Sequence, residues 1–90
     1  MDIEFDPAKR DATLIERGLD MAEAGRVFDG PHLTFEDDRF PYGETRLTTI
    51  GHLDGRMVAF TWTRRGTACR VISMRKCNVR EQALYGSRLG

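Results

Sequence analysis

The chain has 90 residues, enough for one domain, and no apolar run approaches the roughly 20 residues of a membrane-spanning helix. Its formal net charge is zero, but residues 1–44 carry twelve acids and five bases, whereas residues 45–90 carry two acids and nine bases. The two halves could neutralise each other, but the basic half favours nucleic acid or another polyanion as partner. The acidic start lacks the pattern of a signal peptide, so we expect a cytoplasmic protein.

The first thirty residues predict a short strand followed by two helices. Alternating apolar residues indicate the strand, and Asp6-Pro7 is a helix start whose helix ends at Gly18. A second helix is expected from Asp20 to just before Gly30. We expect the first helix to bury its apolar stripe, Ala8, Ala12, Ile15 and Leu19.

The middle of the chain changes from helical to β patterning. A possible strand at Leu33–Phe35 runs into an acidic loop, Glu36–Asp38, which we read as solvated rather than as a cation or partner site. Further on, Arg46–Leu53 and Arg56–Thr63 flank Asp54-Gly55, which is the signal of a type I′ hairpin.

A second turn at Arg65-Gly66 leads into a strand at Ala68–Lys76, so that Arg64 is expected to face Thr67. Strict alternation then assigns the side chains to two faces, and a slip of one residue would exchange them. The face expected to receive both N-terminal helices carries Leu47, Val58, Phe60, Trp62, Cys69 and Val71. The other face carries Ile50, Met57, Ala59, Ile72 and Met74. The whole is an α+β, two-layer domain.

The last element is a short helix from Val79 to Tyr85, for which Asn78 and Glu81 have the spacing of a capping box. Basic side chains gather before and within it. Because free N–H groups and the helix dipole attract anions, we expect an anion site at this helix N-terminus. The bases expected to group around that one surface are Arg46, Arg70, Arg75, Lys76 and Arg80.

The residue types restrict the chemistry. The basic half offers only Asp54 and Glu81 as carboxylates, so a two-metal nuclease is disfavoured, and we expect neither a metal nor another cofactor. Cys69 and Cys77 are read as free thiols. Metal-free RNA cleavage stays open, because RNA brings its own 2′-hydroxyl nucleophile and needs cations at the phosphate and groups that move protons.

Several motifs together resemble the BrnT family of ribonuclease toxins, over about residues 3 to 85. They are Phe5-Asp6-Pro7-x-Lys9, Val27-Phe28-Asp29, Tyr42-Gly43-Glu44-x-Arg46, Thr49-Ile50-Gly51, Leu53-Asp54-Gly55-Arg56, Trp62-Thr63-x-Arg65-Gly66, Arg70-x-Ile72-Ser73-x-Arg75-Lys76 and Arg80-Glu81-Gln82. The resemblance implies one RelE-like toxin domain over residues 1–90. Its partner would be a BrnA-type ribbon-helix-helix antitoxin, in a heterotetramer of two toxins and two antitoxins.

The resulting hypothesis is a metal-independent endoribonuclease that blocks translation. Its catalytic candidates are the five bases named above, and its RNA-binding candidates are Arg65, Lys9, Arg17 and Tyr85. Arg17 stands where the family commonly has a histidine, and an arginine cannot shuttle a proton near neutral pH. The alternative is a non-catalytic module that binds RNA or a partner through the same basic surface.

Overall fold

The computed structural model describes residues 2–39, 41 and 43–89; Tyr42 of the motifs above lies outside them. The elements are β1 (Asp2–Glu4), α1 (Pro7–Arg17), the 3-10 helix η1 (Met21–Asp29), β2 (His32–Asp37), β3 (Arg46–Leu53), β4 (Arg56–Arg65), β5 (Ala68–Lys76) and α2 (Val79–Gly86). The predicted α+β class and element order are confirmed, with the second helix of 3-10 type. Within the described part of the chain, no helix is long and apolar enough to cross a membrane.

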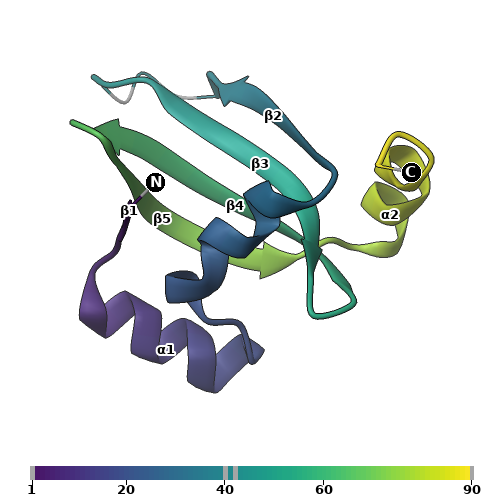
Figure 1. Cartoon of the computed structure of the whole chain (residues 1–90), viewed down its shortest axis with the longest axis horizontal. Helices are drawn as coiled ribbons and strands as arrows, with labels where there is room; N and C mark the ends of the chain where they lie inside the picture. The colour runs from purple at the N-terminus through teal and green to yellow at the C-terminus, as the bar shows by residue number, and fades with distance from the viewer. Residues whose placement is uncertain (1, 40, 42, 90) are drawn as a thin grey trace.

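All the strands form one mixed sheet in the order β1-β5-β4-β3-β2, in which β2 to β5 are an antiparallel meander and β1 runs parallel to β5 (Figure 1). The first hairpin is as predicted, because Asp54 and Gly55 have φ values of 52° and 80°, as a type I′ turn requires. The second turn is one residue later than predicted. Arg65 pairs with Ala68, so Gly66 and Thr67 form the turn.

A β-bulge in β5 decides which side chains share a face. Thr61 pairs with Ser73 and Trp62 pairs with Val71, so Ile72 is an extra residue without a partner on β4. The assignment of Met74 to the face without helices was therefore wrong. Met74 is fully buried in the core beneath η1, and the bulge turns Ser73 and Arg75 to the opposite face.

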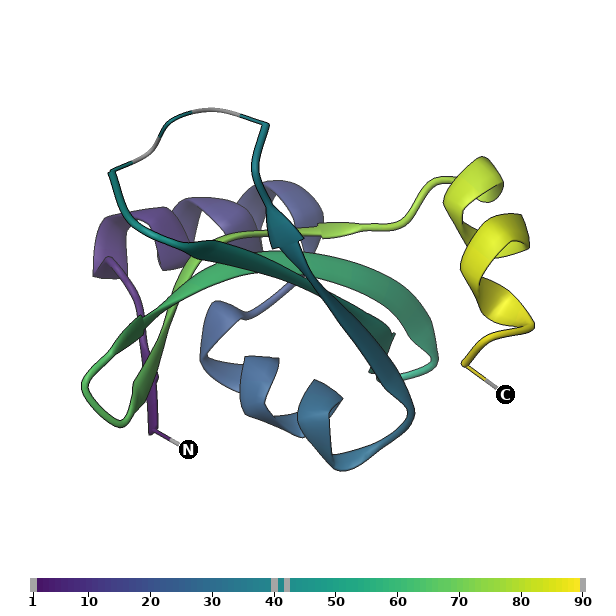
Figure 2. The ribbon, with the colours of Figure 1, turned by 90° about the horizontal axis from the view of Figure 1, so that it is seen from above.

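The main core lies between the sheet and η1, in which Ala24 and Val27 are buried. It contains Leu19, Met21, Leu53, Val58, Phe60, Trp62, Cys69, Val71 and Met74. A second, smaller cluster lies under α2 on the other face and contains Ile50, Ala59, Cys77 and Leu89. The sheet thus has one closed face and one face that α2 covers only at one end (Figure 2).

Helix α1 does not pack on the closed face, contrary to expectation. Three members of its predicted apolar stripe, Ala8, Ala12 and Ile15, are exposed, and only the fourth, Leu19, which follows the helix, is buried in the main core. Thr13 is the one buried residue within α1. Instead α1 lies beside β5 (Figure 1), where Arg17 donates to the Met74 carbonyl at 2.8 Å. Because β1 pairs only with Ala68 to Arg70, the rest of β5 is an open edge, and α1 protects it.

Strand β2 is longer than predicted and takes in part of the acidic segment. Glu36 and Asp37 pair with Leu47 and Arg46 across the sheet, and the side chain of Asp37 is only 3% exposed. The segment is therefore not simply a solvated loop, because pairing with β3 carries one of its carboxylates into the structure.

Trp62 is a core residue, as predicted, and not a base-stacking platform. It is 2% exposed, its Nε1 donates to the Thr49 hydroxyl at 2.8 Å, and its ring meets Phe28 edge-on at 5.6 Å. We expect Trp62→Ala to lower the free energy of unfolding by about 3–5 kcal/mol in urea denaturation, because it leaves a large cavity. Ile15→Ala, at an exposed site, is the control. A Trp62→Ala variant with wild-type stability would contradict this packing.

Candidate functional site

The face of the sheet opposite η1, which we call the open face, carries a row of hydroxyl groups across its centre. Thr48 of β3 pairs with Thr61 of β4, which pairs with Ser73 of β5. The Thr48 and Thr61 hydroxyls are 3.5 Å apart. Side chains two positions away along β3 and β4 continue the same face in both directions, and on β5 Arg75 continues it toward α2. The open face is therefore polar at its centre.

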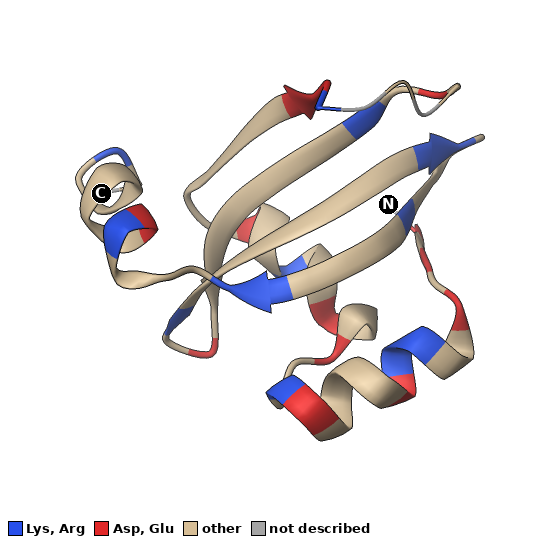
Figure 3. Ribbon diagram, turned by 180° about the vertical axis from the view of Figure 1, so that it is seen from behind, with Lys and Arg blue, Asp and Glu red and all other residues tan. Residues whose placement is uncertain are grey.

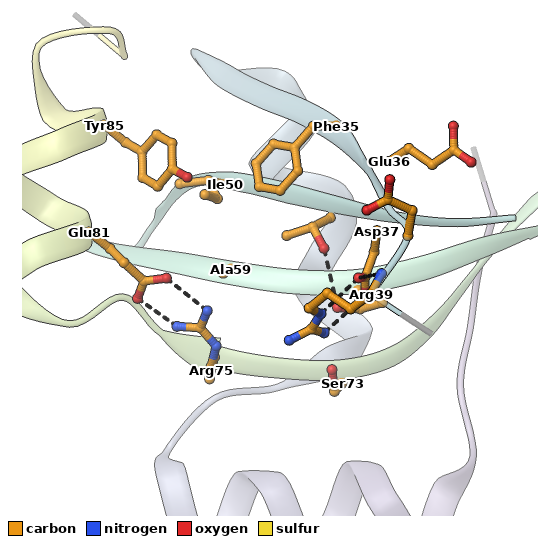
Figure 4. Close-up of a pocket in the computed structure, with 13 residues that line it drawn as sticks. Phe35, Glu36, Asp37, Arg39, Ile50, Ala59, Ser73, Arg75, Glu81 and Tyr85 are labelled. Atoms are coloured by element: carbon orange, nitrogen blue, oxygen red, sulfur yellow. Dashed lines mark hydrogen bonds and ion pairs between the residues drawn. The ribbon is translucent and has the colours of Figure 1, made fainter. Parts of the chain in front are cut away.

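A pocket of about 440 Å³ lies on the open face between β2 and α2 (Figure 4). Besides the hydroxyl row, its lining combines two arginines, four carboxylates and two aromatic rings. These are Arg39, Arg75, Glu36, Asp37, Asp38, Glu81, Phe35 and Tyr85. Such a mixture of cations, bases and rings at one hollow can hold and react with a polar, planar substrate.

An ion pair between β5 and α2 closes one side of this pocket. Arg75 donates to both carboxylate oxygens of Glu81, at 2.7 and 2.8 Å. Glu81 is also the reciprocal member of the predicted capping box, since it accepts from Asn78 N at 2.9 Å while Asn78 accepts from Glu81 N at 2.8 Å. The arginine and the amide together lower the pKa of Glu81 to about 2, so it is ionised at neutral pH.

A second arginine–carboxylate pair lies across the pocket. Arg39 donates to both oxygens of Asp37, at 2.8 and 2.9 Å. The Asp37 side chain is 3% exposed, whereas that of Arg39 is 71% exposed. The carboxylate is thus fixed by β2, and the guanidinium reaches outward from it toward solvent.

Between these two pairs, the rings of Phe35 and Tyr85 are stacked. Their centroids are 6.3 Å apart and their planes differ by 19°. Phe35 remains 42% exposed, and Figure 4 shows the Tyr85 hydroxyl pointing over the pocket. Exposed aromatic faces of this kind stack well on unpaired nucleic-acid bases.

The predicted basic residues do not form one cluster. Arg75 and Tyr85 lie in the pocket described above, whereas four others line a second, open pocket of about 180 Å³ at the far end of the open face. Those four are Lys9, Arg46, Arg65 and Arg70. Arg70 lies near the start of β5, whereas Arg75 and Lys76 end it, and Figure 3 shows basic residues at both ends of the sheet.

The structure does not gather the expected bases as free cations at the N-terminus of α2. Arg75 is paired with Glu81 and does not face that terminus as a free cation. Lys76 pairs with Val58 of the closed face, so alternation directs it away from Arg75. Arg80 is exposed on α2, and Arg17 is bound to the β5 edge. Neither of the two pockets is lined by Lys76, Arg80 or Arg17.

Neither cysteine is placed for nucleophilic chemistry. Cys69 and Cys77 are free and buried, as the sequence predicted. Burial raises the pKa of both thiols, to about 11 for Cys69, so little reactive thiolate exists at neutral pH. Among the described residues, no group of three or more His, Cys, Asp or Glu side chains could hold a metal ion.

A family model described as the ribonuclease toxin BrnT of type II toxin–antitoxin systems matches residues 5–81. The chain belongs to the BrnT family. No curated protein sequence matches it. Membership confirms the resemblance seen in the motifs, and it implies an RNA substrate and an antitoxin partner for this chain.

The pocket beside α2 contains two residues whose place in it the sequence did not predict, Glu81 and Arg39. Glu81 was recognised only as a helix cap, because no local pattern shows that it also reaches Arg75, six residues earlier. Arg39 had no sequence signal, since it follows an acidic run that read as solvated. Tertiary pairing alone brings both to the pocket.

The Arg75–Glu81 pair has a pH signature. The pKa of Glu81 is lowered from 4.5 to about 2, so its stabilising contribution is complete above about pH 4.5 and is lost as pH falls toward 2. We expect Glu81→Gln to lower the free energy of unfolding by about 1 kcal/mol at neutral pH, measured by urea denaturation at several pH values. The fall of that free energy between about pH 4.5 and 2, which we call the acid limb, should be shallower in this variant.

Glu16→Gln is the matched control, because Glu16 is exposed on α1 and makes no ion pair with a described residue. Its acid limb should follow that of the unaltered protein. Identical acid limbs for Glu81→Gln and the unaltered protein would show that the Arg75–Glu81 pair contributes nothing.

Proposed function

We propose that this chain is a metal-independent endoribonuclease whose reaction takes place in the pocket between β2 and α2. The observation that carries the proposal is the bidentate Arg75–Glu81 pair. It places a guanidinium that can bind phosphate next to a carboxylate that can act as a base, beside the stacked rings of Phe35 and Tyr85. Cleavage through the 2′-hydroxyl needs these components and no metal.

The first step is an exchange of partners at Arg75. Its side chain is 50% exposed, and an ion pair at such a site is worth only about 0–1 kcal/mol. A phosphate of RNA offers the same bidentate geometry with a larger charge. When the phosphate takes the guanidinium, the pKa of Glu81 rises back toward its usual range, because its strongest stabilising partner has left.

The freed Glu81 carboxylate then accepts the proton of the 2′-hydroxyl, and the 2′-oxygen attacks the adjacent phosphorus. The bond from phosphorus to the 5′-oxygen breaks, and Tyr85 gives the leaving oxygen its proton. The products are a 2′,3′-cyclic phosphate and a 5′-hydroxyl. Arg75 stabilises the charge on the phosphate during the attack, and a base stacked on Phe35 fixes the strand.

The proposed partner is a BrnA-type ribbon-helix-helix antitoxin, two copies of which hold two toxins in the cytoplasm. Support comes from the family membership, which implies an antitoxin. The mass of the complex purified after co-expression, measured by light scattering, tests the stoichiometry, and a complex of any other composition contradicts it.

We expect purified, antitoxin-free protein to cleave single-stranded RNA in the presence of EDTA. Glu81→Gln should lower the cleavage rate by about 10²-fold or more, because it removes the base. Arg75→Ala should lower it by about 10²- to 10³-fold, because it removes the charge stabilisation. A cyclic-phosphate end on the product, identified by mass spectrometry, checks the chemistry.

Arg26→Ala is the control, because Arg26 makes a similar ion pair with Asp54, at 2.7 Å, outside this pocket. It should leave the rate unchanged. Binding of RNA without any cleavage would instead support the non-catalytic alternative. Full activity of a folded Arg75→Ala, Glu81→Gln double variant would overturn the assignment of the site.

A further inference from the structure

The second pocket of the open face is basic, and the chemistry proposed above does not use it. Lys9 of α1, Arg46 of β3, Arg65 of β4 and Arg70 of β5 line it, together with the carboxylates of Asp6 and Glu44. Four separate elements thus bring their cations to one hollow, although the sequence distributes them over more than sixty residues.

The ion pairs that these cations make with carboxylates are long. Arg46 is 3.6 Å from Glu44, and Arg70 is 3.7 Å from Glu4, distances longer than a hydrogen bond. No carboxylate of the described residues lies within 4.0 Å of the charged nitrogens of Lys9 or Arg65. The pocket beside α2 has the opposite balance, with four carboxylates against two arginines.

The two pockets are continuous along the strands. Arg46 is two residues from Thr48 on β3, and Thr63 is two residues from Thr61 on β4, so each couple shares the open face. On β5, Ile72 of the basic pocket is next to Ser73 of the other. A ligand that crosses the hydroxyl row therefore reaches both.

We propose that the basic pocket is a second phosphate-binding site, which holds the backbone of single-stranded RNA at a distance from the cleaved bond. This inference rests on the proposed function, and it adds the substrate's form and minimum length. The strand must be unpaired, because the stacked Phe35 and Tyr85 need an exposed base. The cations of the basic pocket then bind phosphates further along the same strand.

The geometry sets the length. Arg70 and Arg75 are five residues apart on β5, which corresponds to about 15 Å along the strand. A stacked nucleic-acid strand advances about 3.4 Å per nucleotide, so the basic pocket lies about four nucleotides from the scissile phosphate. A dinucleotide reaches only one site, and an oligonucleotide of about six or more reaches both.

The experiment measures the affinity of 2′-O-methyl RNA, which cannot be cleaved, in lengths of two, four, six and eight nucleotides. For the unaltered protein, affinity should rise with length up to about six nucleotides and then level off. Lys9→Ala with Arg65→Ala should weaken binding of the eight-nucleotide strand by about tenfold and leave the dinucleotide unchanged. The slope of log affinity against log salt should fall by about 1.4, since two contacts are lost.

The matched control is Arg64→Ala with Arg88→Ala, which removes the same charge elsewhere. Arg64 lies 5.3 Å over the ring of Trp62, a residue of the closed face, and Arg88 follows α2. Equal weakening in this control, or affinity independent of length in the unaltered protein, would overturn the second site. Length-dependent binding of these strands, together with no cleavage of unmodified RNA in the EDTA assay above, would instead contradict only the proposed chemistry, so the two failures are distinct.

Discussion

The extra residue in β5 determines what the open face can do. Without the bulge at Ile72, alternation would send Ser73 and Arg75 into the core beneath η1 and would expose Met74 on the other side. With it, Met74 fills the main core and Arg75 stands beside α2 within reach of Glu81. One inserted residue thus serves the packing of the closed face and the chemistry of the open face together.

The attachment of α2 depends on the same arginine. No residue within α2 is buried, and Val79 and Leu84 are 81% and 59% exposed, so packing alone holds the helix weakly. Its position is maintained by the capping box, the Arg75–Glu81 pair, and the contacts of Tyr85 and Leu89 with the small second core. A substrate phosphate that takes Arg75 from Glu81 therefore acts directly on the element that forms one wall of the pocket.

Positive and negative side chains are unevenly divided along the open face, so its two ends differ in electrostatic character. Near α2 the carboxylates outnumber the arginines, and each arginine is already paired bidentately, so that end suits proton transfer more than attraction of a polyanion. At the other end the cations outnumber the carboxylates and the ion pairs are long. The proposed function thus assigns the long-range attraction of RNA and the chemistry to different sets of residues.

The sequence alone determined the helices, strands and turns and their order, because the signals for these elements are local. The Asp6-Pro7 start, the Asp54-Gly55 turn and the Asn78–Glu81 cap each depend on a few neighbouring residues, and the structure places all the elements in the predicted order. Alternation identified Trp62 as core and placed Arg46 and Arg70 on the opposite face, but it misplaced Arg75 and Lys76, which follow the bulge. The residue types, a basic run before the last helix and a tyrosine within it, supplied Arg75 and Tyr85 as site candidates.

What only the tertiary structure decided is how these parts meet. Three features have no local signature, because each depends on contacts between distant segments. They are the exposed apolar residues on α1, the bulge at Ile72 and the inclusion of Asp37 in β2. The bulge reverses the faces for the residues of β5 that follow it and so brings Arg75 onto the open face, while the length of β5 keeps Arg75 and Arg70 in two separate pockets. Local patterns determine which elements form, but the register between strands determines which side chains share a site.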